Sequence, residues 1–432
     1  MLYRIIFITG LLSFTFQIGF SQNSTELLRQ HANTFNSPDD LTAIVDLIDH
    51  EKLVLLGEAS HGTSEYYTKR AAISKALIQE KGFRFIAVEA DWSSTSRVNK
   101  FVKHKQGGPA TIDEAMDTFT RWPLWMWKNE EVKELVQWMR DYNADLPAEE
   151  RVGFYGIDVY DHENVMDDVV EWISGIDQNS GSTASDAYSC LTRFSDTGDY
   201  IRMVAQTRQD CSEDLMEVLD IVRGLEDHPN ADRWGFFRAE QGAKVAINAE
   251  KHFRGNLQRD ASSWNYRASH FYLTAERLLE FYGDKSRGII WAHNTHIGDA
   301  RATEMGRQGA HNIGQLARES LGSDNTFAIG FGTYTGSVLA SYNWEGAMEI
   351  MQVPESPANT WEGMLESVGI EKFYISFSNS NLSEALNRWI PHRAIGVTYN
   401  PRSERGNYVQ TILPERYNAF IFIRETGVLS PL

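Results

Sequence analysis

The stretch Leu53-Val54-Leu55-Leu56-Gly57-Glu58-Ala59-Ser60-His61-Gly62-Thr63 joins a wholly apolar run to a turn that carries an acid and an imidazole. Four consecutive apolar residues are typical of a strand buried on both faces, as in a parallel sheet covered by helices. Gly57 and Gly62 permit tight turns on both sides of Glu58 and His61. The stretch therefore predicts a buried strand whose carboxyl end presents ionisable side chains.

Similar apolar runs recur after this stretch and are separated by sequence with helical periodicity. The runs cover residues 83–88, 152–157, 288–292, 327–331, 373–377 and 419–423, and helical spacing is clear at 73–81 and 132–142. Buried strands that alternate with helices indicate an α/β fold. We predict a mostly parallel central sheet flanked by helices.

The texture changes between residues 160 and 285, where long, charged, helix-forming sequence contains no clear strand. We expect a large helical insertion or lid at 161–285. It would separate an N-terminal half of the α/β core at 22–160 from a C-terminal half at 286–432. The low-complexity segment Ser180–Ser185 is expected to be a loop within this insertion.

Residues 1–21 have the features of a signal peptide: one basic residue, an apolar run and a small residue, Ser21, before polar sequence. An N-terminal membrane anchor is the alternative. A signal peptide predicts an exported protein, periplasmic or secreted, with no stable membrane insertion after cleavage. In that compartment Cys190 and Cys211 could form a disulfide worth about 3 kcal/mol, or stay as two buried thiols, and the sequence leaves both open.

The composition excludes several classes of protein. The 432 residues include 42% hydrophobic and 12% aromatic residues, which is enough for a sizeable core and excludes wholesale disorder. Lys and Arg total 41 against 59 Asp and Glu, so the formal net charge is −18. This acidity argues against a nucleic-acid partner, because phosphates are bound by cationic side chains. Two cysteines cannot build a disulfide-rich scaffold or a cysteine zinc cluster.

Ionisable residues follow four of the predicted strands. They are Glu58, Glu89, Asp158 and His293, with His296 three residues further on. Ligands of open parallel sheets bind off the carboxyl ends of the strands. We therefore expect these five side chains to converge on one site, although a single strand-end carboxylate often only caps the next helix.

His61 is the candidate general base. It precedes a predicted helix, whose positive end favours the neutral ring, while Glu58 and Glu89 favour the protonated ring. A histidine under such opposed influences titrates near neutrality, where a general base works best. Arg70 is a candidate for stabilising an oxyanion. A structural histidine and a surface arginine are the alternatives for these two residues.

The pair His293 and His296 could bind a metal or could act as two hydrogen-bonding groups, and its spacing differs from the helical zincin motif. The sequence contains no Gly-x-Ser-x-Gly elbow, phosphate loop or dinucleotide fingerprint, so serine-hydrolase and nucleotide chemistry have no support. The stretch Phe119–Trp127 is unusually aromatic and contains Trp122, Trp125 and Trp127. It could line a cleft for a bulky apolar ligand or pack in the core.

Four segments of the sequence resemble the erythromycin esterase family. They are residues 56–62 (LGEASHG), 87–92 (AVEADW), 155–158 (YGID) and 291–296 (WAHNTH). The resemblance extends over residues 50–425 and implies a hydrolase that opens the lactone ring of macrolide antibiotics and so confers resistance. It implies His61 as the general base, with Glu58, Glu89, Arg70, His293 and His296 as further active-site positions. It also implies that the enzyme uses no serine nucleophile, no cofactor and no obligatory metal.

The predicted substrate is a small molecule, bulky and apolar, such as a macrolide. Contacts to it are expected from Asp158, Trp92, Trp122, Trp125 and Trp127. Three alternatives stay open: a metal-dependent hydrolase with Glu58, His61, Glu89 and His293 as ligands, a binding module that only sequesters its ligand, and an esterase for another exported or cell-envelope substrate.

Overall fold

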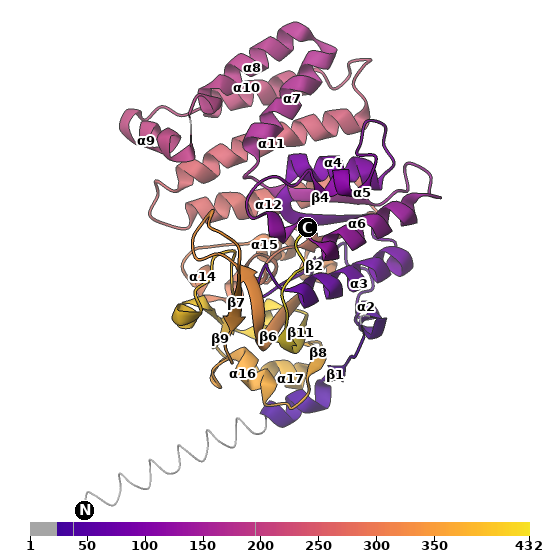
Figure 1. Cartoon of the computed structure of the whole chain (residues 1–432), viewed down its shortest axis with the longest axis vertical. Helices are drawn as coiled ribbons and strands as arrows, with labels where there is room; N and C mark the ends of the chain where they lie inside the picture. The colour runs from indigo at the N-terminus through magenta and orange to yellow at the C-terminus, as the bar shows by residue number, and fades with distance from the viewer. Residues whose placement is uncertain (1–23, 38, 195) are drawn as a thin grey trace, which may run out of the picture.

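A nine-stranded sheet forms the centre of the molecule, which we describe from a computed structural model (Figure 1). The structure describes residues 24–37, 39–194 and 196–432, so the predicted signal peptide lies outside the described residues. The strand order is β1-β8-β11-β6-β2-β5-β3-β4, and β7 pairs with β6. The strands are β1 (Asn33–Thr34), β2 (Leu53–Leu56), β3 (Phe85–Asp91), β4 (Gly153–Asp158), β5 (Gly288–Trp291), β6 (Thr326–Ala340), β7 (Glu349–Val353), β8 (Lys372–Ser376) and β11 (Ala419–Thr426).

The prediction of a mostly parallel α/β sheet is confirmed. Neighbouring strands from β11 through β6, β2, β5 and β3 to β4 are all parallel, whereas β1, β7 and β8 pair antiparallel to their neighbours. A separate ribbon pairs β9 (Ile390–Arg393) with β10 (Tyr408–Thr411).

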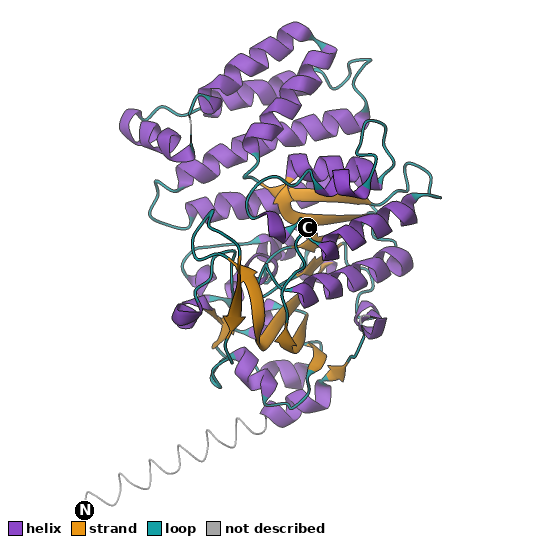
Figure 2. Ribbon diagram, viewed as in Figure 1, coloured by secondary structure: helices purple, strands orange, loops and turns teal. Residues whose placement is uncertain are grey.

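Helices cover both faces of the sheet, as Figure 2 shows. Val54 and Leu56 of β2 pack with α3 (Ser64–Lys81), α4 (Trp92–Val102) and α6 (Glu130–Asn143). Leu53 and Leu55, which point to the opposite face, pack with α12 (Ser262–Tyr282), α15 (Ile313–Leu321) and α16 (Trp361–Glu366). Burial of alternate side chains on opposite faces explains why each central strand is apolar throughout.

The helices between β4 and β5 form a layer of their own beyond one edge of the sheet (Figure 1). They are α7 (His162–Ile176), α8 (Gln178–Thr192), α9 (Thr197–Thr207), α10 (Ser212–Gly224) and α11 (Arg233–Gly255), and α12 follows them. The first five share a hydrophobic core separate from the two cores on the sheet. Within the described part of the chain, none of the helices has the length and apolar character needed to cross a bilayer.

The predicted loop at Ser180–Ser185 is wrong, because these residues lie inside α8. A side chain at Gly181 would place its Cβ 2.0 Å from Ser174 Oγ of α7. The small residues therefore allow two neighbouring helices to approach closely, rather than forming a connection between them.

A disulfide joins Cys190 of α8 to Cys211, which immediately precedes α10. We expect the double variant Cys190→Ser/Cys211→Ser to lose about 3 kcal/mol of stability, because the bridge links residues 21 positions apart in the sequence. Thermal unfolding measured without reductant checks this. Equal melting temperatures of the variant and the wild type would show that the bridge adds no stability.

Candidate active site

The register of the parallel strands places four chain segments side by side at the carboxyl-terminal ends of the strands. Leu56 pairs with Trp291, Trp291 with Val88, and Val88 with Gly156. Glu58, Glu89, Asp158 and His293 each lie one or two residues beyond these partners. The segments therefore converge as the strand-end pattern predicts.

Glu58 and His61 form a buried hydrogen-bonded pair. His61 Nδ1 lies 2.9 Å from Glu58 Oε1, and Arg70 donates from Nη2 to Glu58 Oε2 at 2.7 Å. When Nδ1–H of His61 donates to the carboxylate, the lone pair of Nε2 is free to accept a proton. Glu58 is thus the residue that orients the candidate base, and Arg70 fixes Glu58 through its other carboxylate oxygen.

Backbone contacts fix the turn that carries His61. The amides of Leu339 and Leu429 donate to the carbonyl of Gly62 at 3.1 and 3.2 Å. A Cβ on Gly62 would lie only 2.0 Å from the carbonyl oxygen of Leu339, so the close approach requires glycine at this position. Strand β6 and the C-terminal segment therefore hold the turn in place.

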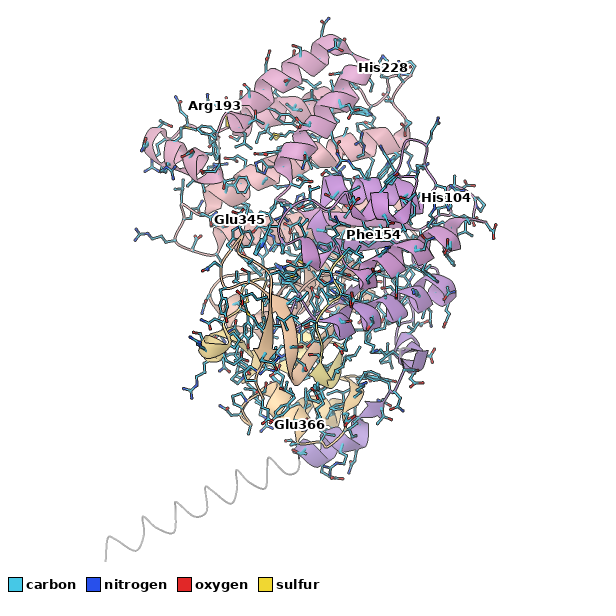
Figure 3. All side chains as sticks on the ribbon, viewed as in Figure 1. His104, Phe154, Arg193, His228, Glu345 and Glu366 are labelled. Carbon is cyan, nitrogen blue, oxygen red and sulfur yellow. A yellow bond between two sulfur atoms is a disulfide. The ribbon has the colours of Figure 1, made fainter. Side chains whose placement is uncertain are left out.

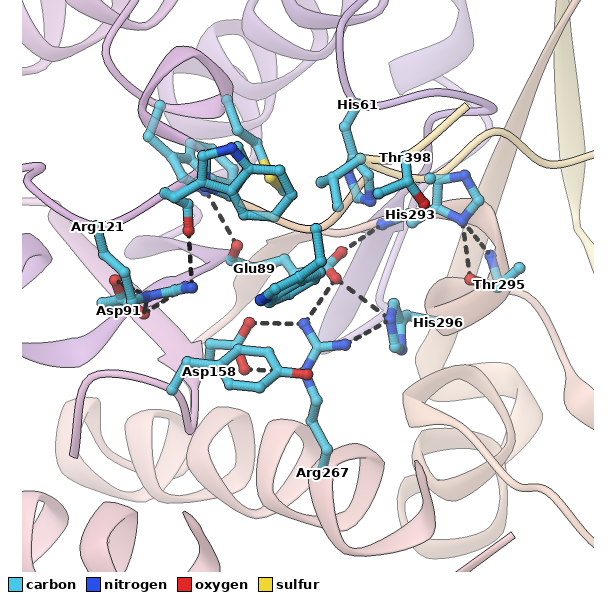
Figure 4. A pocket seen from close by; sticks show the side chains of 18 of the residues that line it. His61, Glu89, Asp91, Arg121, Asp158, Arg267, His293, Thr295, His296 and Thr398 are labelled. Carbon is cyan, nitrogen blue, oxygen red and sulfur yellow. Dashed lines mark hydrogen bonds and ion pairs between the residues drawn. The ribbon is translucent and has the colours of Figure 1, made fainter. Parts of the chain in front are cut away.

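Arg267 of α12 links two of the strand-end acids (Figure 4). It donates from Nε and Nη2 to Asp158 at 2.9 and 2.6 Å, and from Nη2 to Glu89 Oε1 at 2.9 Å. The same Glu89 oxygen lies 3.2 Å from His296 Nε2, and Glu89 Oε2 accepts from the His293 amide at 2.9 Å. Glu89 is therefore the centre of the network on this side of the site.

His293 and His296 are held differently. His293 Nδ1 accepts from the Thr295 amide at 3.3 Å, so the neutral ring carries its proton on Nε2. The ring of His293 lies 4.9 Å from that of His61, between centroids. The ring of His296 stacks on Trp264 at 4.5 Å.

The pKa values of the neighbouring His61 and His293 are shifted in opposite directions. Burial alone would lower the pKa of His61, but the hydrogen bond and charge of Glu58, together with the charge of Glu89, raise it above its ordinary value. Burial and the neighbouring His61 hold the pKa of His293 well below its ordinary value. His61 can thus take up a proton while His293 stays neutral, and such a division is typical of acid–base sites.

The acids of the network remain ionised. Burial would raise the pKa of Glu89, but His296 and Arg267 hold it well below its usual range. Burial likewise opposes ionisation of Asp158, and Arg267 overcomes it and lowers the pKa. At Asp91, which binds Arg121 through both oxygens, burial dominates and raises the pKa to about 6.

A cavity of about 380 Å³ opens above these side chains. The charged and imidazole residues that line it are His61, Glu89, Asp91, Arg121, Asp158, Arg267, His293 and His296. Its walls include the aromatic residues Phe119, Trp122, Trp127, Tyr160, Trp264 and Trp344. Mostly apolar walls with a few convergent polar groups are typical of small-molecule sites.

Four of the predicted site residues lie away from the cavity lining, and the first of them is Glu58, which reaches the cavity only through its hydrogen bond to His61. Arg70 is fully buried against Glu58 and stacks over the rings of Tyr67 and Trp291. Trp92 packs on Tyr155 in the core on the α12 face. Trp125 lies in the opposite core, whereas Trp122 and Trp127 line the cavity.

Sequence reasoning missed Arg267, Trp264, Tyr160 and Trp344 as cavity residues. Arg267 and Trp264 belong to the predicted helical insertion, and Trp344 belongs to the connection between β6 and β7. No local motif marks them.

The described side chains offer no metal site of free ligands. Among the described residues, one group of three or more possible ligands lies within metal-binding distance: Cys190, Cys211 and Asp214. The two sulfur atoms of that group are joined to each other in the disulfide. In the cavity, the guanidinium of Arg267 is the cation that faces Glu89 and Asp158.

Comparison with known proteins matches residues 78–426 to the family model described as erythromycin esterase. The chain belongs to the erythromycin esterase family. The chain is therefore an ester hydrolase, because the family and the curated relatives are named as esterases or hydrolases. The resemblance noted in the sequence is confirmed.

Relatives of this esterase chain are distant. The erythromycin esterase type II of Escherichia coli is 22% identical over 368 residues, which cover 79% of this chain and 84% of that protein. A solved structure from Bacillus cereus has a TM-score of 0.80 at 20% identity and covers 95% of this chain and 99% of that chain. The erythromycin esterase EreC, as a mutant in its open conformation, has a TM-score of 0.68 at 15% identity, covering 92% and 98%. At these identities the two structures show a shared fold.

Proposed function

We propose that this esterase hydrolyses the lactone bond of a macrolide or a similarly bulky, apolar ester with water activated by His61. The observation that carries the proposal is the Glu58–His61 pair, whose histidine lines an aromatic-walled cavity. Resistance to a macrolide antibiotic would be the biological result.

In the proposed reaction, His61 Nε2 removes a proton from water as the water attacks the ester carbonyl. Glu58 accepts from Nδ1–H and stabilises the imidazolium that forms. Arg267, His293 and His296 line the same cavity, and the Nε2–H of His293 is the donor proposed for the oxyanion, since Arg267 and His296 already face Glu89. Arg70 contributes by fixing Glu58, since it does not line the cavity.

The test is to incubate purified protein with a macrolide panel, with and without chelator, and to measure product masses. Ring opening adds one water to the substrate, and full activity with chelator supports the His61 mechanism. Activity lost with chelator and restored by metal supports a metal-dependent hydrolase instead. Bound but unchanged macrolide indicates a sequestering module, and turnover of other esters alone indicates another exported substrate.

The pH profile offers a specific prediction about His61. Only the neutral ring acts as a base, so activity falls as the pH drops through the pKa of His61. Because that pKa is raised, we expect the acid limb of kcat/KM to inflect above about 6.5, the ordinary histidine value. Glu58→Gln removes the main raising influence and should shift the inflection to lower pH while it also lowers the plateau. An unshifted inflection in Glu58→Gln would assign the limb to another group.

Trp344 is expected to bind substrate at the cavity mouth. Its ring contacts that of Trp122 in a tilted arrangement, with the centroids 4.7 Å apart, although its own side chain is largely exposed. We expect Trp344→Ala to raise KM by about fivefold with little change in kcat, because one aromatic contact is worth roughly 1 kcal/mol. Tyr342→Ala is the matched control: Tyr342 is similarly exposed on the same turn but does not line the cavity. Similar KM values for the two variants would contradict this role.

Export to the periplasm or medium is part of the proposal. The signal-like residues 1–21 and the disulfide both suit an oxidising compartment. The N-terminus of protein recovered from each cell fraction tests it, since export with cleavage near Ser21 gives a shortened chain outside the cytoplasm.

A further inference from the structure

We infer that a second buried carboxylate–imidazole pair, Glu362 with His392, positions the active-site turns through Asn294. The inference rests on the proposed function only for its kinetic consequence. The pair lies outside the cavity lining, so it does not contact substrate, and the proposed mechanism leaves it unused.

Both members of the pair are completely buried. Glu362 of α16 accepts from His392 Nδ1 at 2.6 Å and from the Arg393 amide at 2.9 Å. Burying an ionised carboxylate is costly unless hydrogen bonds compensate it. Packing alone therefore does not account for a charged group in this place.

The pair is connected to the site by one amide side chain. His392 Nε2 lies 3.3 Å from Asn294 Nδ2, which also donates to the carbonyl of Phe331 at 2.7 Å. Asn294 Oδ1 accepts from the Phe331 amide at 3.3 Å. Both donor hydrogens of the amide are thus used, and its orientation is fixed.

The direction of the link depends on the charge of His392. Burial lowers the pKa of His392 even though Glu362 opposes this, so the ring is neutral. With its proton on Nδ1, facing Glu362, the ring presents an acceptor at Nε2 to the Asn294 donor. Glu362 thereby sets which ring nitrogen accepts from Asn294.

Asn294 holds the two halves of the candidate site together. It lies between His293 and Thr295, and its backbone amide donates to the carbonyl of Glu58 at 2.9 Å. A Cβ on Gly57 would lie 2.1 Å from Asn294 Oδ1, so the turn before Glu58 packs directly on this side chain. A displacement of Asn294 therefore moves both the Glu58–His61 turn and the His293–His296 segment, and displacements of about 1 Å cost about 100-fold in rate.

Two substitutions of His392 separate its two contacts. His392→Asn keeps a donor near the position of Nδ1 and so keeps Glu362 paired, but it loses the contact with Asn294. His392→Gln keeps an acceptor near the position of Nε2 but leaves Glu362 without its ring donor. We expect His392→Asn to lower kcat by about 10- to 100-fold with KM little changed, and His392→Gln to retain most of kcat.

Thermal stability should rank in the opposite order, since His392→Gln leaves a buried carboxylate underpaired. That reversal is the readout that a merely structural role would not give. If kcat simply follows stability across the two variants, the positioning inference is overturned. Glu404→Gln is the control, because Glu404 binds the adjacent Arg393 at 2.8 Å and does not line the cavity, and it should leave kcat unchanged.

A second measurement does not require turnover. The proton shared between His61 Nδ1 and Glu58 should give a low-field NMR signal in protein labelled at histidine nitrogen. We expect His392→Asn to shift or broaden this signal, and His392→Gln and Glu404→Gln to leave it in place. A response of the signal in a protein that hydrolyses no ester would support the positioning role and contradict the proposed function. If the enzyme is active and His392→Asn changes neither kcat nor the NMR signal, the positioning role alone is overturned.

Discussion

Replacing His61 with asparagine is expected to lower kcat by about 100- to 10,000-fold, the range that a general base contributes. Asparagine places an N–H donor near the position of Nδ1, so it keeps a partner for Glu58 Oε1, which lies 2.9 Å from the ring nitrogen. The variant removes Nε2, the nitrogen that accepts the proton. The measurement is steady-state hydrolysis of the ester that the macrolide panel identifies as a substrate. Thermal unfolding verifies that the variant is folded.

His311→Asn is the matched control for this substitution. His311 is half-buried and contacts Ser269 and Asn265, but it does not line the cavity. We expect this variant to keep kcat within a factor of about two, because His311 does not line the cavity and so does not contact the substrate. Near-normal turnover in His61→Asn would end the proposed mechanism, because that mechanism assigns the proton of the attacking water to His61 Nε2.

The sheet could be predicted because its central strands are buried on both faces. Runs such as residues 53–56 and 288–292 show no polar alternation, and several such runs separated by helical sequence are typical of a parallel sheet covered on both sides. Parallel pairing then brings the carboxyl ends of the strands together, so the convergence of Glu58, Glu89, Asp158 and His293 followed from the order of residues alone.

The cation of the site could not be predicted in the same way. Arg267 belongs to α12, more than 100 residues after Asp158, and one arginine in an amphipathic helix gives no local signal. The sequence predicts Arg70 as the cation of the site, but Arg70 lies on the buried face of α3, where it donates to Glu58. Both positions depend on how helices pack on the sheet, which local periodicity does not determine.

The position of one peripheral turn also could not be predicted from local sequence (Figure 3). Glu345, labelled there, marks the turn between β6 and β7 that also carries Trp344 to the cavity mouth. In sequence this turn has only the composition of an exposed loop. Its contact with Trp122, more than 200 residues away, is a tertiary one.

Glu89→Gln is expected to be the most damaging substitution on the other side of the cavity, with kcat lowered by about 100-fold or more. Glu89 receives donors at both oxygens, from Arg267 and from the His293 amide, and His296 Nε2 lies 3.2 Å away. Whichever way the glutamine amide turns, its NH2 group faces one of these donors. Arg267 and the two histidines then lose their common acceptor and shift from their positions.

The same substitution should cost about 3–5 kcal/mol of stability at neutral pH, as breaking one buried ion pair does. The pKa of Glu89 is held well below its usual range in the folded state, so its ionised form stabilises the fold at every pH above the unfolded value. The stability difference between wild type and Glu89→Gln should therefore be constant near neutrality. It should shrink only as the pH falls below about 4.3, the ordinary glutamate value.

Asp91→Asn is the control on the same strand. Asp91 also binds an arginine, Arg121, through both oxygens and lines the same cavity. Glu89, in contrast, accepts from the His293 amide and contacts His296 Nε2. We expect its kcat to fall by no more than about tenfold, because removing one hydrogen-bonded charge away from the reacting atoms disturbs binding more than chemistry. Equal losses in the two variants would mean that any strand-end acid of this cavity matters through its charge alone. A larger loss in Glu89→Gln assigns the effect to the contacts that Glu89 makes with Arg267, His293 and His296.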